Sequence, residues 1–200
     1  MKVFATIDAR KFNDDKFLNE ALSNASEFRK KKYDSINNEL GKLQVLANTY
    51  LLNICLKEFG KVEKDMEYVI EKNGKLRFAN ADDIHFNLSH SKNMSLAVVS
   101  DKPVGCDIQF IDKVDEKIFD LVLSADEKKL VTGASDIVGA GYASPNEIFY
   151  RLWSMKEAVI KKDGSGLRDR LTNVHDENVY IEKRVLRNKE EVENYILAII

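Results

Sequence analysis

Flexible linkers are missing from this sequence, whose 200 residues hold only 2 prolines and 9 glycines. Segments rich in Pro, Gly or Ser are the usual spacers between separately moving domains. The length suits either one globular unit or two small lobes. If the chain forms two lobes, we expect them to pack directly against each other.

Charge is nearly balanced along the chain, with 31 Lys and Arg residues against 33 Asp and Glu residues and a formal net charge of -2. No global positive field draws the protein to nucleic acid or to an anionic membrane, so any anion site must be local. We therefore expect no nucleic-acid partner and no membrane partner. We also expect a monomer.

The two cysteines, Cys55 and Cys106, lie in apolar runs and not in a metal-ligand spacing. This argues against a disulfide scaffold and a zinc site and indicates a reducing compartment. The first ten residues lack the regions of a signal peptide. The apolar run at residues 196–200 is far shorter than the ~20 residues that span a bilayer. These features predict a cytoplasmic protein.

Hydrophobic periodicity predicts the elements of the first half. We expect a strand over residues 3–7, surface helices within 13–32, and a core helix over 40–59 whose apolar residues recur every three or four positions. The turn sequence Asn73-Gly74 between two short strand-like segments predicts a hairpin.

Three further strands are predicted over residues 84–90, 95–99 and 104–110 from alternating or continuous apolar residues. In the last of these, the alternation places Asp107 and Gln109 on the face opposite the apolar one. The two polar side chains are therefore expected on the same face of the strand.

The second half contains a helix whose N-terminus can be predicted, because Ser144, Pro145 and Glu147 form a capping box ahead of apolar residues. We expect this helix to end near Gly164. The tail is predicted to hold strands, a short charged helix over 188–193 and a last strand at 195–200. Its resemblance to residues 94–99 suggests that the two halves are structurally related.

Several residues admit both an ordinary and a chemical interpretation. Glu157 and Lys161 form either an exposed ion pair across one helix turn or a metal-binding carboxylate beside a phosphate-binding ammonium group. Asp107 is either a solvated acid or, with Glu157 and Gln109, part of a magnesium site. His90, after Ser89 at a strand end, is either a surface residue or part of an anion site.

The basic residues of the first half are equally ambiguous. The run at residues 29–32 is either a solvated helix face or an anion site, and Lys75 is either a turn lysine or a phosphate contact. Together these signals favour phosphate chemistry. The sequence contains no GxGxxG, Walker A, HExxH or GxSxG motif.

Three segments together resemble the motifs of the 4′-phosphopantetheinyl transferases, in particular the Sfp type. They are FNLSHS (86–91), VGCDIQ (104–109) and LWSMKEAVIKKDGSGL (152–167). The resemblance implies an α/β (α+β) fold of two similar lobes related by a pseudo-twofold axis, each a small, mainly antiparallel sheet packed with helices. The lobes would be residues 1–103 and 104–200, with coenzyme A in the cleft between them.

The resemblance also implies a reaction, the Mg²⁺-dependent transfer of 4′-phosphopantetheine from coenzyme A to a serine of an apo acyl or peptidyl carrier protein, with release of 3′,5′-ADP. Asp107, Gln109 and Glu157 would hold the metal, although the family often has Glu in place of Gln109. The catalytic residues would be Asp107, Glu157 and Lys161, with Glu157 or a metal-bound water taking the serine proton. Glu127 matches a third acidic position of the family.

Coenzyme binding is implied for a further set of residues: Arg29, Lys31, Gly74, Lys75, Ser89, His90, Lys156 and Lys161. Ser89 and His90 would hold the 3′-phosphate, and Lys156 and Lys161 would meet the diphosphate. Two alternatives stay open. Gln109 and a short C-terminal region would suit a catalytically weak module that binds coenzyme A or a carrier protein. The residues that favour phosphate binding, taken alone, would also suit a metal-dependent phosphohydrolase or nucleotide binder.

Overall fold

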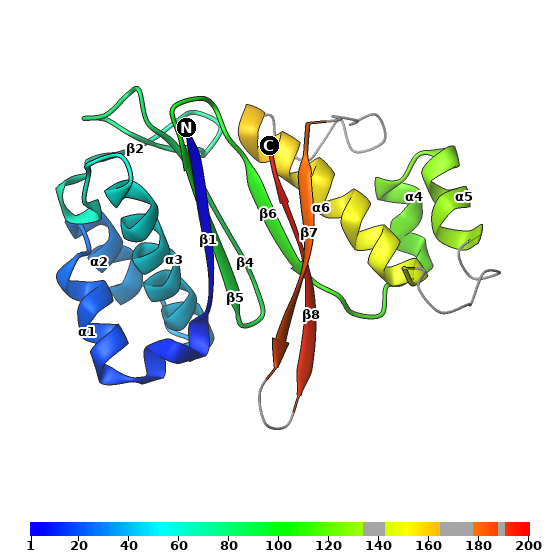
Figure 1. The fold of residues 1–200 in the computed structure, drawn as a ribbon, viewed down its shortest axis with the longest axis horizontal. Helices are drawn as coiled ribbons and strands as arrows, with labels where there is room; N and C mark the ends of the chain where they lie inside the picture. Colours follow the sequence, from blue (N-terminus) through cyan, green and yellow to red (C-terminus); the bar gives the residue numbers. More distant parts are fainter. Residues whose placement is uncertain (134–142, 165–177, 188–190) are drawn as a thin grey trace.

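A computed structural model describes residues 1–133, 143–164, 178–187 and 191–200. Two three-stranded antiparallel sheets pack face to face, with helices on both outer sides (Figure 1). The order of layers is α3 (Glu39–Lys57), the first sheet, the second sheet and α6 (Pro145–Asp163). No helix in the described ranges has the length and apolar character needed to cross a membrane.

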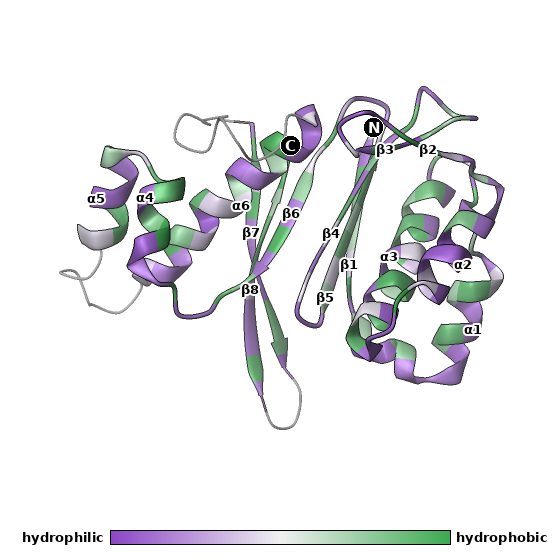
Figure 2. Cartoon of the chain, turned by 180° about the vertical axis from the view of Figure 1, so that it is seen from behind, coloured by the Kyte–Doolittle hydropathy of each residue, from purple (hydrophilic) through white to green (hydrophobic). Residues whose placement is uncertain are grey.

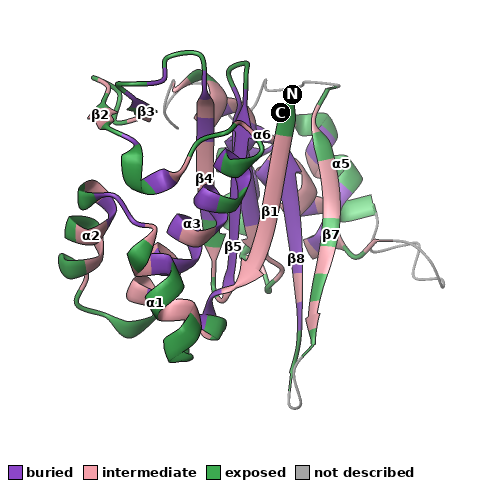
Figure 3. Ribbon diagram, turned by 60° about the vertical axis from the view of Figure 1, so that its left-hand side comes forward, coloured by how far each residue is buried: buried purple, intermediate pink, exposed green. Residues whose placement is uncertain are grey.

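The first sheet has the strand order β1-β5-β4, formed by β1 (Lys2–Asp8), β5 (Met94–Ser100) and β4 (His85–Ser91). Every residue of β5 is buried, since one face packs against α3 and the other against the second sheet (Figure 3). A strand covered on both faces reads as a continuous apolar run, which explains the sequence MSLAVVS. The predicted strands over residues 3–7, 84–90 and 95–99 are confirmed.

Helices of the first half cover the outer face of this sheet, and their ribbons carry both hydrophilic and hydrophobic segments (Figure 2). A 3₁₀ turn (Ala9–Asn13) leads to α1 (Asp15–Ser23) and α2 (Glu27–Asp34). The long α3 contributes Leu51, Leu52 and Leu56 to the core. The predicted surface helices and core helix are therefore confirmed.

The predicted hairpin is confirmed as β2 (Tyr68–Ile70) paired with β3 (Leu76–Phe78), after a 3₁₀ turn (Glu63–Asp65). Gly74 has a φ of +86° in the connecting turn, a conformation that favours glycine. Asn73 Oδ1 accepts a hydrogen bond of 3.0 Å from the Lys75 backbone N–H. The Asn73-Gly74 signal thus set the turn.

The second sheet has the order β6-β8-β7, formed by β6 (Cys106–Phe110), β8 (Val192–Ile199) and β7 (Tyr180–Arg187). Between β6 and β7 lie a 3₁₀ turn (Glu116–Ile118), α4 (Phe119–Val122), α5 (Ala125–Gly133) and α6. Ser144 caps α6 by accepting a 3.2 Å hydrogen bond from the Glu147 N–H, and Gly164 ends the helix with a φ of +67°. Both predicted boundaries are confirmed.

The prediction of a short charged helix over 188–193 is wrong for Val192 and Glu193, which begin β8. Pairing with Arg187 and Leu186 of β7 supplies their backbone partners, and this tertiary pairing outweighs the helical tendency of a charged segment. Residues 188–190 lie outside the described residues. The predicted strand at 195–200 is confirmed.

The two sheets follow the same plan. In each, the middle strand of the sheet is the last in sequence, and a 19-residue helix packs on the outer face. Apolar residues of β5, β6 and β8 form one shared core between the sheets. The expected direct packing, without a linker, is therefore what the structure shows.

A buried acid also joins the two parts of the chain. Glu193 of β8 accepts hydrogen bonds from Asn93 Nδ2 (2.8 Å) and the Tyr195 hydroxyl (3.1 Å). Arg10, which is held by Asp8, reaches the same carboxylate at 3.3 Å. This contact ties the β4–β5 turn and the end of β1 to the second sheet.

Candidate functional site

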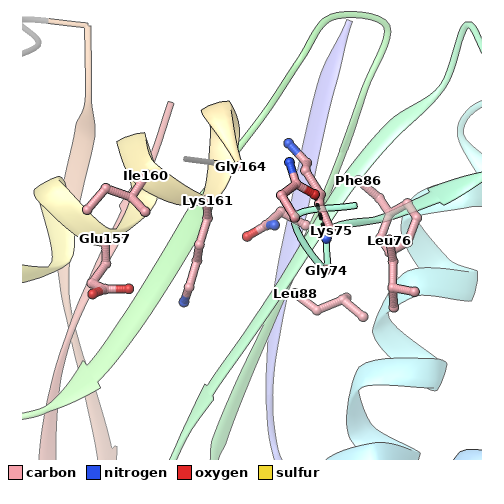
Figure 4. Close-up of a pocket in the computed structure, with 11 residues that line it drawn as sticks. Gly74, Lys75, Leu76, Phe86, Leu88, Glu157, Ile160, Lys161 and Gly164 are labelled. Carbon is pink, nitrogen blue, oxygen red and sulfur yellow. Dashed lines mark hydrogen bonds between the residues drawn. The ribbon is translucent and has the colours of Figure 1, made fainter. Parts of the chain in front are cut away.

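A cavity of about 410 Å³ opens between the β2–β3 turn, β4 and α6. Its volume lies in the range of small-molecule sites. Figure 4 shows Glu157 and Lys161 projecting side by side from α6, with Gly74, Lys75 and Leu76 on the opposite side. The cavity therefore brings together predicted residues from both halves of the sequence.

Asp107 lies beside this cavity, on β6, with its side chain 1% exposed. Its Oδ1 accepts from Lys161 Nζ at 2.6 Å and from the Ser89 hydroxyl at 3.0 Å, and its Oδ2 accepts from Gln109 Nε2 at 3.0 Å. Burial opposes the charged form of Lys161, but the Asp107 carboxylate outweighs it and raises the pKa of Lys161. The carboxylate thus sits in a shell of three donors.

Glu157 is buried one turn before Lys161, and its Oε1 has no hydrogen-bond partner among the described residues. Burial raises the pKa of Glu157, the Asp107 charge adds to this shift, and Lys161 opposes it. A buried carboxylate oxygen without a partner is costly. This oxygen is therefore available to a cation or a proton from a ligand.

The donor set can be compared with what a magnesium ion requires. The described residues contain no group of three or more His, Cys, Asp and Glu side chains able to hold a metal. Mg²⁺, however, is usually held by one or two carboxylates together with water and substrate phosphate. Asp107 and Glu157 supply two carboxylates, one with an unpartnered oxygen, and the amide of Gln109 adjoins Asp107. These residues fit such an ion.

Lys75 crosses from the hairpin to α6, where its Nζ donates a 2.5 Å hydrogen bond to the Lys162 carbonyl. Burial lowers the pKa of Lys75. The left-handed Gly164 lies against the same turn, because a Cβ placed there would come within 2.3 Å of Asn73 Nδ2. The hairpin turn therefore rests on the C-terminal end of α6 and closes one side of the cavity.

His90 follows Ser89 at the end of β4 and is exposed. Its Nδ1 lies 3.3 Å from Asn48 Nδ2 of α3. Burial lowers the pKa of His90, and the nearby Lys161 ammonium lowers it further, while Asp107 opposes the shift. The ring is therefore close to the Asp107 network, although it does not line the cavity.

The structure does not bring Arg29 or Lys31 to the cavity lining. Arg29 is buried in α2, where its Nε donates to the Tyr68 hydroxyl at 3.3 Å and lies 3.7 Å from Glu63 Oε1. Lys31 is exposed on the same helix. These two residues stand apart from the Asp107 network.

Lys156 is also separated from the cavity, because its side chain is fully buried. Its Nζ donates to Glu127 Oε2 at 2.6 Å and to the Val122 carbonyl at 2.7 Å. Ser124 and Glu127 in turn cap the start of α5. Lys156 and Glu127 therefore form a structural pair that fastens α5 to α6.

The contact between the polar side chains of β4 and the backbone of β6 was not predicted from the sequence. Asn87, Ser89 and Ser91 alternate along β4, and their side-chain oxygens accept hydrogen bonds from backbone N–H groups of β6. The donors are Cys106, Ile108 and Phe110, in the same order. The alternation in FNLSHS was visible, but nothing local indicated that its polar face is covered by another strand.

Known proteins resemble this chain over about half of its length. Residues 103–198 match the family model of the 4′-phosphopantetheinyl transferase superfamily. A segment of 105 residues is 39% identical to 4′-phosphopantetheinyl transferase psf-1 of Bacillus pumilus, covering 51% of this chain and 42% of the relative.

Two further relatives agree. The chain is 27% identical over 123 residues to 4′-phosphopantetheinyl transferase Sfp of Bacillus subtilis, covering 62% of this chain and 52% of Sfp. It is 35% identical over 85 residues to 4′-phosphopantetheinyl transferase gsp of Aneurinibacillus migulanus, covering 42% and 33%. The matches thus span about half or less of the relatives' length. The family resemblance predicted from the sequence is confirmed.

Proposed function

Because residues 103–198 match the family model of the 4′-phosphopantetheinyl transferase superfamily, we propose that this chain transfers 4′-phosphopantetheine from coenzyme A to a serine of an apo acyl or peptidyl carrier protein. The observation that carries the proposal is that Glu157 and Lys161 line one cavity and that Lys161 pairs with the buried Asp107 beside it. These residues come from the second and third motifs of the family resemblance.

The proposed reaction needs no covalent enzyme intermediate. The serine oxygen attacks the phosphorus that bears the pantetheine arm, a new P–O bond forms, and the P–O bond to the leaving 3′,5′-ADP breaks. Glu157 accepts the serine proton, a role that suits a carboxylate whose pKa burial has raised. The Lys161 ammonium group, which Asp107 holds at the cavity, faces the diphosphate, where negative charge develops.

We infer that Asp107 and Glu157, with the Gln109 amide, would hold Mg²⁺. A bound Mg²⁺ supplies positive charge that stabilises the diphosphate leaving group. The unpartnered Glu157 oxygen supports this assignment. Gly74 and Lys75 border the cavity on the hairpin side, and His90 lies at the end of β4, so these residues are proposed to contact the coenzyme. Lys156 is omitted because it is buried against Glu127.

The architecture is proposed to follow the same family. We infer two similar lobes, residues 1–103 and 104–200, related by a pseudo-twofold axis. The shared strand order and the matching 19-residue helices support this relation. Two free, buried cysteines suit a protein that works as a monomer in a reducing cytoplasm.

The test is to incubate the protein with coenzyme A, Mg²⁺ and several apo carrier proteins, and to look by mass spectrometry for one phosphopantetheine on the carrier serine. Asp107→Ala and Glu157→Ala should each abolish transfer while the circular dichroism spectrum is retained. Near-normal turnover in both variants would contradict the assigned roles. Tight coenzyme binding without carrier modification would favour a binding module, and hydrolysis of coenzyme A without an acceptor would favour a phosphohydrolase.

A further inference from the structure

We propose that Ser89 is a positioning residue, which holds Asp107 and Lys161 in place across the junction of the two sheets, and that it does not bind a coenzyme phosphate. The inference rests on the proposed function, since it concerns the same cavity. It differs from the role that the family resemblance implies for Ser89, which is contact with the 3′-phosphate.

The hydrogen-bonding capacity of the Ser89 hydroxyl is fully used. A serine hydroxyl has one donor and two acceptor lone pairs. Its proton is donated to Asp107 Oδ1 at 3.0 Å, and its oxygen accepts from the Ile108 N–H at 3.2 Å and from Lys161 Nζ at 3.1 Å. Ser89 itself is only 5% exposed. A phosphate could be bound only by giving up one of these contacts.

The contacts of Ser89 belong to a continuous seam. We define the seam as Asn87, Ser89 and Ser91 of β4 with the β6 backbone N–H groups that they accept. Because β6 is the edge strand of its sheet, those N–H groups would otherwise have no partner in a ladder. Side chains of one sheet thus replace a strand at the edge of the other.

Ser89 occupies the middle of the seam, at the level of Asp107. It is the member of the seam that also bonds the two charged groups of the site. Asp107 lies on β6, Lys161 lies on α6 and Ser89 lies on β4, so a single hydroxyl sets the relative position of three elements. This arrangement orients the Asp107 carboxylate before any ligand arrives.

Position along the strand separates Ser89 from His90. Successive side chains of a strand point to opposite faces, so the two residues cannot present their side chains in the same direction. His90 contacts Asn48 of α3 and is exposed, whereas Ser89 faces β6. The 3′-phosphate is therefore assigned to the His90 side.

Two donors test this division of roles. Coenzyme A and dephospho-coenzyme A differ only in the 3′-phosphate, so the ratio of their dissociation constants measures the recognition of that group. The ratio and kcat are measured for the wild type, Ser89→Ala and Ser91→Ala. Ser91→Ala is the matched control, because it deletes the same atom and the same kind of seam bond, to Phe110, without touching Asp107 or Lys161.

We expect Ser89→Ala to keep the wild-type ratio within about twofold and to lower kcat about tenfold or more, since a hydrogen bond to a charged group contributes about that factor. Ser91→Ala should leave both quantities near the wild-type values. A Ser89→Ala variant that loses the preference for coenzyme A and retains kcat at saturation would overturn the proposal. An equal loss of kcat in Ser91→Ala would also overturn it, because the effect would then belong to the seam as a whole.

Hydrogen exchange of single amides by NMR tests the contact without relying on activity. The Ile108 amide should exchange at least about tenfold faster in Ser89→Ala, while the Phe110 amide is unchanged. In the wild type, adding coenzyme A should leave the Ile108 rate unchanged, and this arm needs no variant to fold. Faster Ile108 exchange on coenzyme binding would show that Ser89 turns to the phosphate. If the wild type neither binds nor transfers, the proposed function fails, and the comparison of amide rates still decides whether Ser89 holds β6.

Discussion

Gly105, just before β6, offers a sharp test of how closely the site depends on backbone packing. A Cβ at this position would lie 2.0 Å from the Ala158 carbonyl oxygen and 2.5 Å from the Lys162 backbone nitrogen. Gly105 cannot easily move away, since its N–H and carbonyl pair with Ile200 at 3.2 and 3.1 Å. The strand and the backbone of α6 are therefore in direct contact.

Gly105→Ala should push α6 away from β6. Real Cβ contacts under 3.0 Å essentially do not occur, so the shift needed is about 1.0 Å. Movement of that size along the line between Lys161 and Asp107 would stretch their 2.6 Å contact to about 3.6 Å, beyond hydrogen-bond reach. Misplacement of catalytic groups by about 1 Å can lower a rate about 100-fold. Overpacking should also cost about 1–3 kcal/mol of unfolding free energy.

The assay combines kcat for carrier modification with thermal unfolding. A loss of about 1–3 kcal/mol in a chain of this size corresponds to a Tm lowered by roughly 2–12 °C. Gly133→Ala is the control, because a Cβ there meets no atom of the described residues within 4 Å. It should change neither kcat nor Tm appreciably. A Gly105→Ala variant with kcat within twofold of the wild type and an unchanged Tm would refute the argument that this glycine positions α6.

Three further predictions concern other residues of the site. Burial raises the pKa of Glu157, so the folded protein loses stability as pH rises through that pKa. Without metal, Glu157→Gln should therefore have a higher Tm than the wild type at pH 7, and this difference in Tm should shrink toward pH 4. In the transfer assay with Mg²⁺, Glu157→Gln should be inactive. Lys156→Ala should lower the unfolding free energy in urea by about 3–5 kcal/mol, because it breaks the buried 2.6 Å ion pair with Glu127, while the dissociation constant for coenzyme A stays unchanged. Gly164→Ala should raise that dissociation constant several-fold, measured by calorimetry, since the left-handed φ of +67° strains alanine and the added Cβ pushes on Asn73.

Local signals predicted the elements well. The Ser144 cap, the Gly164 stop and the Asn73-Gly74 turn each depend on the conformation of a few neighbouring residues, and the structure has all three features. The segment at 188–193 was misread because its charges resemble those of a surface helix. The partner strand β7, which makes Val192 and Glu193 extended, cannot be seen within the segment itself.

The candidate site was predictable only as far as its residue types. Asp107 and Glu157 were singled out by alternation and helical spacing, but either could have been a solvated acid. Whether such an acid is solvated or part of a site depends on burial by elements distant in sequence. Lys161 pairs with Asp107 across 54 positions, and Lys156 pairs with Glu127 across 29. Two lysines of the same motif thus have different environments, since Lys161 lines the cavity and Lys156 lies in the core.

The polar face of β4 shows most clearly why the contacts around the site could not be predicted from the sequence. The strand predicted over residues 84–90 contains Asn87 and Ser89 and stops short of Ser91, and its sequence does not indicate what covers these polar side chains. The structure covers that face with β6, whose edge N–H groups need the acceptors that these side chains provide. The same bonds that join the two sheets therefore also place Asp107, so packing of the two parts and assembly of the site are one event. A change that loosens the junction should lower turnover before it unfolds either sheet.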